Sequence, residues 1–166
     1  MDKMWAPWRS RYITHLNQKV KGCVFCKIIK EKKDKENYIF IRTKHSFAVL
    51  NLFPYNNGHV LVLPNRHVRD TGDFHEEEIQ DIFKLINHVK NLLKKRIHPD
   101  GFNIGMNLGK YSGAGVPGHA HFHIVPRWKG DVNFMPVLSN TKVISQSLRE
   151  LYLILKYVRP RKGKRS

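Results

Sequence analysis

Three histidines alternate with apolar residues in the segment GHAHFHIVP, residues 118–126, as His119, His121 and His123. Successive side chains of a β-strand point to opposite faces, so a strand over 118–126 would place all three imidazoles on one face. A single histidine in a core is common, but three desolvated imidazoles in a row bring no gain in packing. The spacing therefore predicts a functional face.

The residues around these histidines indicate the chemistry of that face. No Asp or Glu occurs between residues 37 and 69 or between 101 and 130, whereas metal-dependent phosphate hydrolysis usually recruits carboxylates. A histidine-rich face bordered by Lys110, Arg127 and a Gly-rich loop suits a bound anion. Imidazole is largely unprotonated near pH 7 and can attack phosphorus directly. The sequence thus predicts nucleophilic catalysis on a phosphate compound rather than metal catalysis.

The two cysteines, Cys23 and Cys26, form a single CxxC motif. One such pair provides no disulfide framework, so it is a metal-binding knuckle, a redox pair or a pair without a special role. A tetrahedral zinc site would need two more ligands, and histidines would have to supply them.

Alternating strand and turn signals predict the sheet that carries these residues. Five runs are rich in β-branched, aromatic and leucine side chains and are bounded by turn residues: 38–42, 46–51, 59–63, 102–107 and 118–126. They follow one another closely enough for an antiparallel arrangement.

Residues 76–97 instead repeat with the period of a helix. Three glutamates lie in the first turn and three basic residues in the last, as the helix dipole favours. The apolar positions that we assign to its buried face are Ile79, Ile82, Phe83, Ile86, Val89, Leu93 and Ile97. The fold class is therefore α+β, with one long helix and an antiparallel sheet.

The charge and length of the chain limit its partners and its domain organisation. The 166 residues carry a formal net charge of +17, which points to an anionic partner. We expect a single domain over 1–155 and a basic, solvated tail over 156–166. No apolar run approaches the ~18 residues that span a bilayer, and the N-terminal residues lack the apolar stretch of a signal peptide, so we expect a cytoplasmic protein with no membrane partner.

The motif GHAHFHIV, from Gly118 to Val125, matches the histidine triad pattern, and the chain resembles the histidine triad (HIT) family. The stretch NLFPYNNGHVLVLPNRH, from Asn51 to His67, is similar to the upstream part of the family pattern, and the resemblance covers about residues 38–127. The segment WAPWR at residues 5–9 and residues 130–136 resemble the branch that acts on diadenosine tetraphosphate, which includes phosphorylases and fragile-histidine-triad-like hydrolases.

The resemblance implies a role for each histidine. His121 would attack the α-phosphorus of a nucleotide and carry the nucleotidyl group. His123 and His59 would donate hydrogen bonds to the non-bridging oxygens, and His119 would orient His121 through the neighbouring backbone.

The resemblance also implies the residues that bind the rest of the substrate. Asn51 would hold the ribose, Asn107 would contact the bridging oxygen and phosphate, and Ser112 would assist the leaving group. The base would lie against apolar residues of the early strands, namely Phe47, Leu50 and Leu52.

In family members with an N-terminal CxxC, the zinc site is completed by histidines that correspond here to His67 and His119. The resemblance thus implies a structural Zn²⁺ held by Cys23, Cys26, His67 and His119. It also implies a homodimer in which two five-stranded sheets join into one of ten strands. We expect the tryptophans Trp5, Trp8 and Trp128 to pack in the core or at the dimer interface.

Two further activities stay open at this point. The excess positive charge admits an aprataxin-like enzyme that removes adenylate from nucleic-acid ends, and the family also suggests hydrolysis of nucleoside phosphoramidates. A binding module without catalysis is disfavoured because His121 is present. The small-nucleotide enzyme is preferred, with either water or phosphate as the final acceptor.

Overall fold

The computed structural model describes residues 22–131 and 144–157. It contains one five-stranded sheet, in the order β1-β2-β3-β5-β4, in which every neighbouring pair is antiparallel. The strands are β1 Ile39–Arg42, β2 Ser46–Leu50, β3 Val60–Pro64, β4 Gly101–Met106 and β5 Phe122–Arg127. The predicted α+β class and the five strands are thereby confirmed. Trp5, Trp8, most of 130–136 and most of the basic tail lie outside the described residues.

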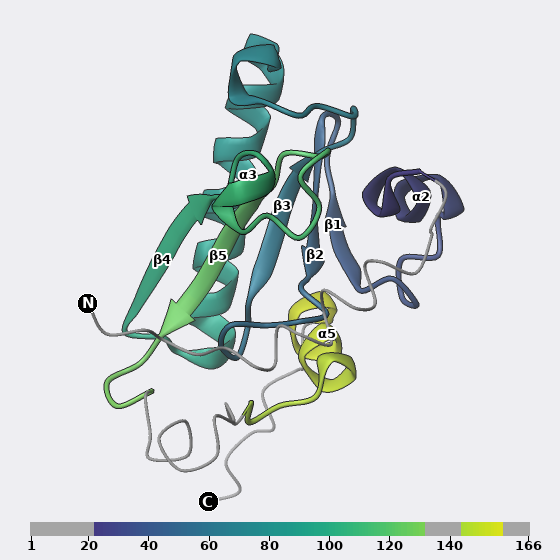
Figure 1. Cartoon of the computed structure of the whole chain (residues 1–166). Coiled ribbons are helices and arrows are strands. Elements are labelled where there is room, and N and C mark those ends of the chain that lie inside the picture. The colour runs from purple at the N-terminus through teal and green to yellow at the C-terminus, as the bar shows by residue number, and fades with distance from the viewer. Residues whose placement is uncertain (1–21, 132–143, 158–166) are drawn as a thin grey trace, which may run out of the picture.

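Helices cover both faces of this sheet (Figure 1). The long helix α3 (Glu76–Ile97) packs against β2, β3 and β5, and α5 (Leu148–Lys156) packs against β1 and α3. Together they enclose the larger part of the hydrophobic core. A smaller apolar cluster lies where Phe25 of α2 (Val24–Glu31) meets Phe47 of β2 and Leu63 of β3. Neither α2 nor α5 was predicted from the sequence.

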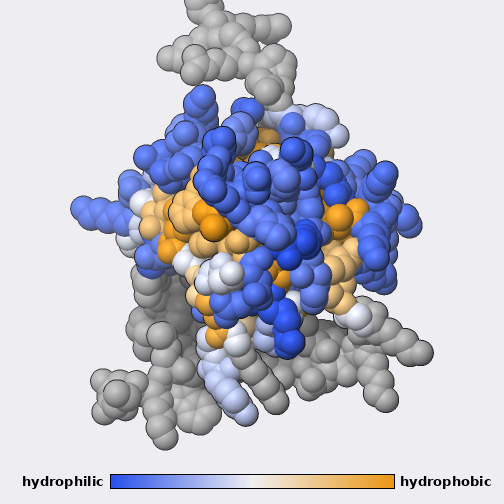
Figure 2. Space-filling view, turned by 90° about the horizontal axis from the view of Figure 1, so that it is seen from above, coloured by the Kyte–Doolittle hydropathy of each residue, from blue (hydrophilic) through white to orange (hydrophobic). Residues whose placement is uncertain are grey.

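The surface is hydrophilic over much of the face seen in Figure 2, with apolar patches among the polar side chains. Among the described residues, no helix is both long and apolar enough to cross a membrane.

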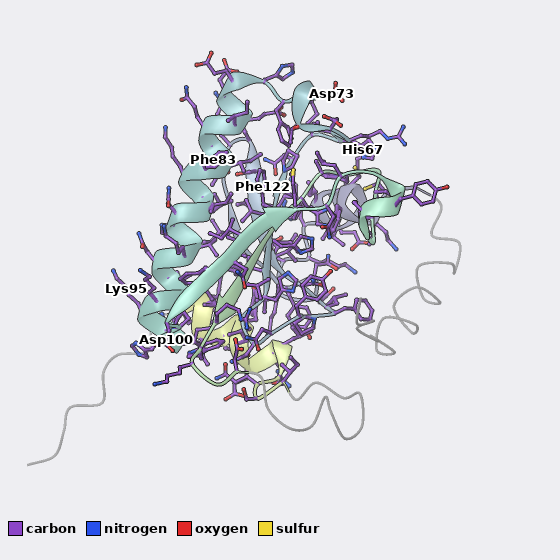
Figure 3. The ribbon with its side chains drawn as sticks, turned by 60° about the vertical axis from the view of Figure 1, so that its left-hand side comes forward. His67, Asp73, Phe83, Lys95, Asp100 and Phe122 are labelled. Carbon is purple, nitrogen blue, oxygen red and sulfur yellow. The ribbon has the colours of Figure 1, made fainter. Side chains whose placement is uncertain are left out.

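Helix α3 begins and ends where the sequence predicts. His75 and Glu78 form a reciprocal capping box at its start, and His98 adopts a left-handed conformation (φ 49°) at its end. The predicted buried face is wrong at two positions, because Ile79 and Phe83 are 40% and 53% exposed. Phe83 lies beside the sheet and meets Phe122 edge to face, with ring centroids 5.8 Å apart (Figure 3).

The triad strand begins later than predicted. β5 starts at Phe122, so His119 and His121 precede the sheet and lie outside any strand. The ladder with β3 begins at Val62 and Phe122; β3 ends at Pro64, which has no N–H to donate to a longer ladder. The backbone N–H of Ala120 donates instead to the carbonyl oxygen of Val68. His119 and His121 therefore lie outside the regular part of the strand, although both of their rings contact Phe25 of α2.

Candidate active site and metal centre

A cavity of about 200 Å³ opens beside the second and third triad histidines. Its walls come from α2, the end of β2 with the loop that follows, residues 115–116, and the start of β5. Most of the lining side chains are apolar, while His121 and His123 contribute the imidazoles. Such a cavity suits an aromatic base with a phosphate at its polar end.

The geometry around His121 fixes which nitrogen of its ring can react. Nδ1 lies 2.8 Å from the carbonyl oxygen of His119, and a carbonyl only accepts, so Nδ1 carries the proton and Nε2 carries the lone pair. The side chain is 4% exposed, and this burial lowers its pKa despite the hydrogen bond to His119. His121 is therefore a neutral imidazole at pH 7, with Nε2 available as a nucleophile.

A second pair of imidazoles lies beside the first. His59 Nδ1 accepts a hydrogen bond of 3.0 Å from the backbone N–H of Tyr55, so the proton of neutral His59 is on Nε2. That Nε2 lies 2.9 Å from His123 Nδ1 and donates to it, which places the proton of neutral His123 on Nε2. His59 is 1% exposed and does not line the cavity. Its position differs from the direct phosphate contact that we predicted, because its Nε2 is directed at His123.

Three of the four residues that we predicted to contact the nucleoside line the cavity. Asn51, Leu50 and Leu52 line the cavity, but Phe47 is fully buried in the apolar cluster beneath α2 and does not reach it. Asn51 Oδ1 accepts a hydrogen bond of 3.0 Å from the backbone N–H of Phe53, which fixes the amide at the cavity wall.

Neither of the two predicted polar residues of the Gly-rich region lines the cavity. The exposed Ser112 hydroxyl donates to the carbonyl oxygen of Gly109 over 2.9 Å within its own turn, and Asn107 is half-buried after β4. Gly115 and Val116 occupy the wall instead.

Arg127, which we expected to border the anion site, is engaged with other residues. Arg127 forms an ion pair of 2.6 Å with Asp131, and a second nitrogen donates to Asn103, so its guanidinium is engaged away from the triad. The cavity is not entirely free of carboxylates, because Glu36 lies at its wall, one residue before the acid-free stretch begins. The imidazoles of His121 and His123 share the polar part of the lining with Glu36, Asn37 and Asn51.

Sequence reasoning missed several residues that line the cavity. Phe25 lies inside the CxxC motif, and its ring contacts His119 and His121 with centroid distances of 5.6 and 5.5 Å. Tyr55 lies in the segment from Asn51 to His67, four residues before His59. Both are aromatic residues close to predicted site residues, and this feature of the sequence could have identified them. The others missed are Val24, Ile28, Asn37, Val49, Phe53 and Leu61.

The two cysteines meet two histidines at the end of the sheet near α2. The ligand atoms of Cys23, Cys26, His67 and His119 all lie within 4.8 Å of one another, and three sulfur–nitrogen distances are 3.3, 3.4 and 3.7 Å. Bonds of about 2.0–2.3 Å from one tetrahedral ion would separate its ligand atoms by about 3.3–3.8 Å. The cluster therefore fits a single metal ion.

His119 is prepared for this role by its surroundings. Its Nε2 donates to the carbonyl oxygen of Pro64 over 3.1 Å, which leaves the Nδ1 lone pair directed at the two sulfur atoms. Burial lowers the pKa of His119 to about 4, so the ring is neutral at pH 7, as a metal ligand must be.

Comparison with known proteins agrees with this arrangement. Residues 32–130, more than half of the chain, match the HIT domain. The chain is 34% identical over 161 residues to an AP-4-A phosphorylase of Mycobacterium tuberculosis, covering 93% of this chain and 83% of that protein. It is 38% identical over 116 residues to the asymmetrical bis(5'-nucleosyl)-tetraphosphatase of Schizosaccharomyces pombe, covering 69% and 63%.

A solved structure shares the fold. The crystal structure of a zinc-bound histidine triad family protein from Mycobacterium smegmatis matches with a TM-score of 0.66 and 26% identity, covering 81% of this chain and 91% of that one. Together with the triad geometry and the HIT domain match, this similarity shows that the chain belongs to the histidine triad (HIT) family.

Proposed function

We propose that this protein cleaves a dinucleoside polyphosphate through a covalent intermediate on His121, from which the nucleotidyl group passes to water or to phosphate. The observation that carries the proposal is the buried, neutral His121 at the polar end of an apolar cavity, with its Nδ1 held by the His119 carbonyl oxygen. The names of the two enzymes to which it is similar, a phosphorylase and a tetraphosphatase, support this substrate class.

The reaction proceeds in two displacements at the α-phosphorus. His121 Nε2 forms a P–N bond as the P–O bond to the departing polyphosphate breaks. Water or inorganic phosphate then attacks the same phosphorus, breaks the P–N bond, loses a proton and releases the neutral imidazole. The His119 carbonyl oxygen stabilises the positive charge that develops on His121 in the first step.

The second imidazole pair stabilises charge on the phosphate. With His59 donating to its Nδ1, His123 has its remaining N–H on Nε2 for the non-bridging or leaving oxygens. The base lies among the apolar side chains of the cavity, including Leu50 and Leu52, and the Asn51 amide contacts the ribose hydroxyls.

The metal is proposed to be Zn²⁺. Two thiolates and two imidazoles are a donor set typical of structural zinc, and the similar Mycobacterium smegmatis protein binds zinc. When bound, the ion supplies a cross-link between α2 and the segment that precedes β5. His119 would hold the ion through its ring while its backbone carbonyl orients His121, so the bound metal would support the reacting group structurally.

A homodimer is proposed to form along the open edge of the sheet. β4 is the terminal strand next to β5, and its Ile104 is 44% exposed. Such an edge, with apolar side chains left in water, favours pairing with a second copy. Sedimentation of the wild type should show a dimer, and Ile104→Lys should show a monomer.

A product assay tests the reaction. Diadenosine tetraphosphate is incubated with and without inorganic phosphate, and the nucleotides are separated. ADP plus ATP formed only with phosphate indicates a phosphorylase, and AMP plus ATP indicates asymmetric hydrolysis. Two ADP would indicate symmetric cleavage at a β-phosphorus and would contradict attack at the α-phosphorus. No product from any dinucleoside polyphosphate, with adenylated DNA processed efficiently instead, would overturn the proposal in favour of the aprataxin-like activity.

A further inference from the structure

Tyr55 lies against both members of the second imidazole pair. Its ring centroid is 4.8 Å from that of His59 at an interplanar angle of 31°, and 5.6 Å from that of His123 at 25°. The two imidazole centroids are themselves 5.1 Å apart. The Tyr55 ring therefore covers both imidazoles. The orientation of those imidazoles determines where their N–H groups point.

The backbone of the same residue determines the tautomer of His59. The Tyr55 N–H donates to His59 Nδ1, and Asn51 Nδ2 lies 3.2 Å from the same nitrogen. With Nδ1 acting as the acceptor, Nε2 is the donor toward His123. A flip of the His59 ring would exchange nitrogen for carbon at both contacts and interrupt this chain of hydrogen bonds.

The loop that carries Tyr55 is fixed at its other residues. The buried Asn56 donates through Nδ2 to the carbonyl oxygen of Pro126 over 3.0 Å and to Asp131 over 2.8 Å. Gly58 has a φ of +75°, and a Cβ there would lie 2.6 Å from Ile97 Cδ1, so only glycine fits without a shift. The Tyr55 ring is thus presented by a rigid turn.

We propose that Tyr55 is a positioning residue whose ring and backbone N–H hold the His59–His123 pair in the orientation and tautomers that present an N–H to the phosphate. The inference rests on the proposed function, in which His123 acts on the substrate. The ring acts through its flat face, which restricts rotation of the two imidazoles, and the role is assigned to the ring rather than to its hydroxyl.

Nitrogen-15 NMR of the histidine rings tests the proposal without any substrate. His59 and His123 signals are assigned with His59→Gln and His123→Gln proteins. In the wild type, both rings should be Nε2-protonated tautomers at pH 7.5. Tyr55→Leu keeps the backbone N–H but removes the flat ring, so the His59 ring should be able to rotate out of its contact with that N–H and give mixed tautomers. Tyr55→Phe keeps the ring and should keep the wild-type pattern. A Tyr55→Leu protein with unchanged signals at both histidines would overturn the proposal.

Kinetics with the substrate identified by the product assay provide the second test. Tyr55→Leu should lower kcat by about 10- to 100-fold with KM changed by no more than about twofold, and Tyr55→Phe should recover most of kcat. Tyr157→Leu, at an exposed tyrosine beyond α5, is the matched control, and melting curves confirm folding. A change confined to KM would show that Tyr55 contacts substrate instead. The NMR test needs no turnover. It can therefore be read even if the protein does not act on dinucleoside polyphosphates, so the two proposals can fail separately.

Discussion

In the proposed mechanism, two histidines separated by one residue would serve different chemistries because different groups engage their rings. His119 directs Nδ1 at two sulfur atoms, whereas His121 uses its own Nδ1 on the His119 carbonyl oxygen. Burial keeps both rings neutral at pH 7. A neutral imidazole with a fixed tautomer is a good ligand or a good nucleophile, and the neighbouring groups decide which.

Replacement of the nucleophile should abolish turnover without abolishing binding. His121→Gln is expected to lower kcat by at least about three orders of magnitude, because the P–N bond cannot form. Nucleotide affinity measured by calorimetry should fall by no more than about tenfold, since the apolar walls remain. His88→Gln, at an exposed position on α3, is the control. Near wild-type turnover in His121→Gln would rule out the covalent mechanism.

At the scale of elements, α2 depends on tertiary contacts for its place in the fold. Its eight residues are too few to form a stable helix alone. The CxxC motif at its start joins it to the segment before β5, and Phe25 anchors it in the smaller apolar cluster. Since α2 forms one wall of the cavity, a metal ion bound by this cluster would help to shape the proposed substrate site.

Removal of the metal should therefore lower stability. Elemental analysis of protein purified without a metal-affinity tag should find one Zn²⁺ per chain, and Cys26→Ser should lose it. The melting temperature should fall by about 5 °C or more, because metal binding stabilises only the folded state. Lys30→Ser, at an exposed position of the same helix, should leave both values unchanged. Metal-free wild-type protein of full stability would contradict the zinc assignment.

The start of α3 is held by a carboxylate with two partners. Glu78 is 4% exposed, accepts the backbone N–H of His75 over 2.9 Å and pairs with Arg66 over 2.7 Å. The hydrogen bond from Arg66 is the main cause that lowers the pKa of Glu78 below its ordinary value of 4.5, against the opposing effect of burial. A depressed carboxylate pKa stabilises the fold above pH 4.5, and this contribution is lost as the pH falls through the lowered value.

Glu78→Gln should remove that contribution. We expect a loss of about 1–2 kcal/mol in the free energy of unfolding at pH 7, the range for a lost cap and a partly exposed ion pair. The difference from wild type should shrink as the pH is lowered from 5 to 3, which urea unfolding at each pH would measure. Glu77→Gln, on the exposed side of the same turn, is the control. A difference that does not change with pH would show that the charge of Glu78 is not responsible.

At the scale of the whole molecule, the positive charge is concentrated outside the described residues. Residues 22–131 and 144–157 contain nineteen basic and twelve acidic side chains, a net charge of +7, so ten of the seventeen excess charges belong to the remaining segments. Charge this far from the triad in sequence need not serve the small-nucleotide reaction, and fields beyond ~8 Å are screened at physiological salt.

Deletion of residues 160–166, which carry four basic side chains, should leave turnover of a dinucleoside polyphosphate nearly unchanged. Binding to duplex DNA should be weak in the full chain. On deletion, the slope of log K against log salt for any such binding should become shallower by up to about four, because each of the four basic side chains can make one phosphate contact worth about 0.9. Faster processing of adenylated DNA than of free dinucleotide, lost on truncation, would instead assign the tail to a nucleic-acid substrate.

The sequence by itself determined the features that arise from neighbouring residues. Helix α3 could be bounded at Glu76 and Ile97 because its end charges and apolar period are local. The five strands were found to within a few residues for the same reason, and the alternation of the triad identified the segment that we propose to react.

The tertiary structure decided what those residues contact. Cys23 and His119 meet although 96 residues separate them, and the resemblance to relatives, not any local pattern, suggested that pairing. The burial of Phe47, the ion pair that turns Arg127 away, and the Tyr55 ring over His59 and His123 were not foreseen. Each depends on how separate strands and loops pack in space, and period and composition carry no information about which distant side chains become neighbours.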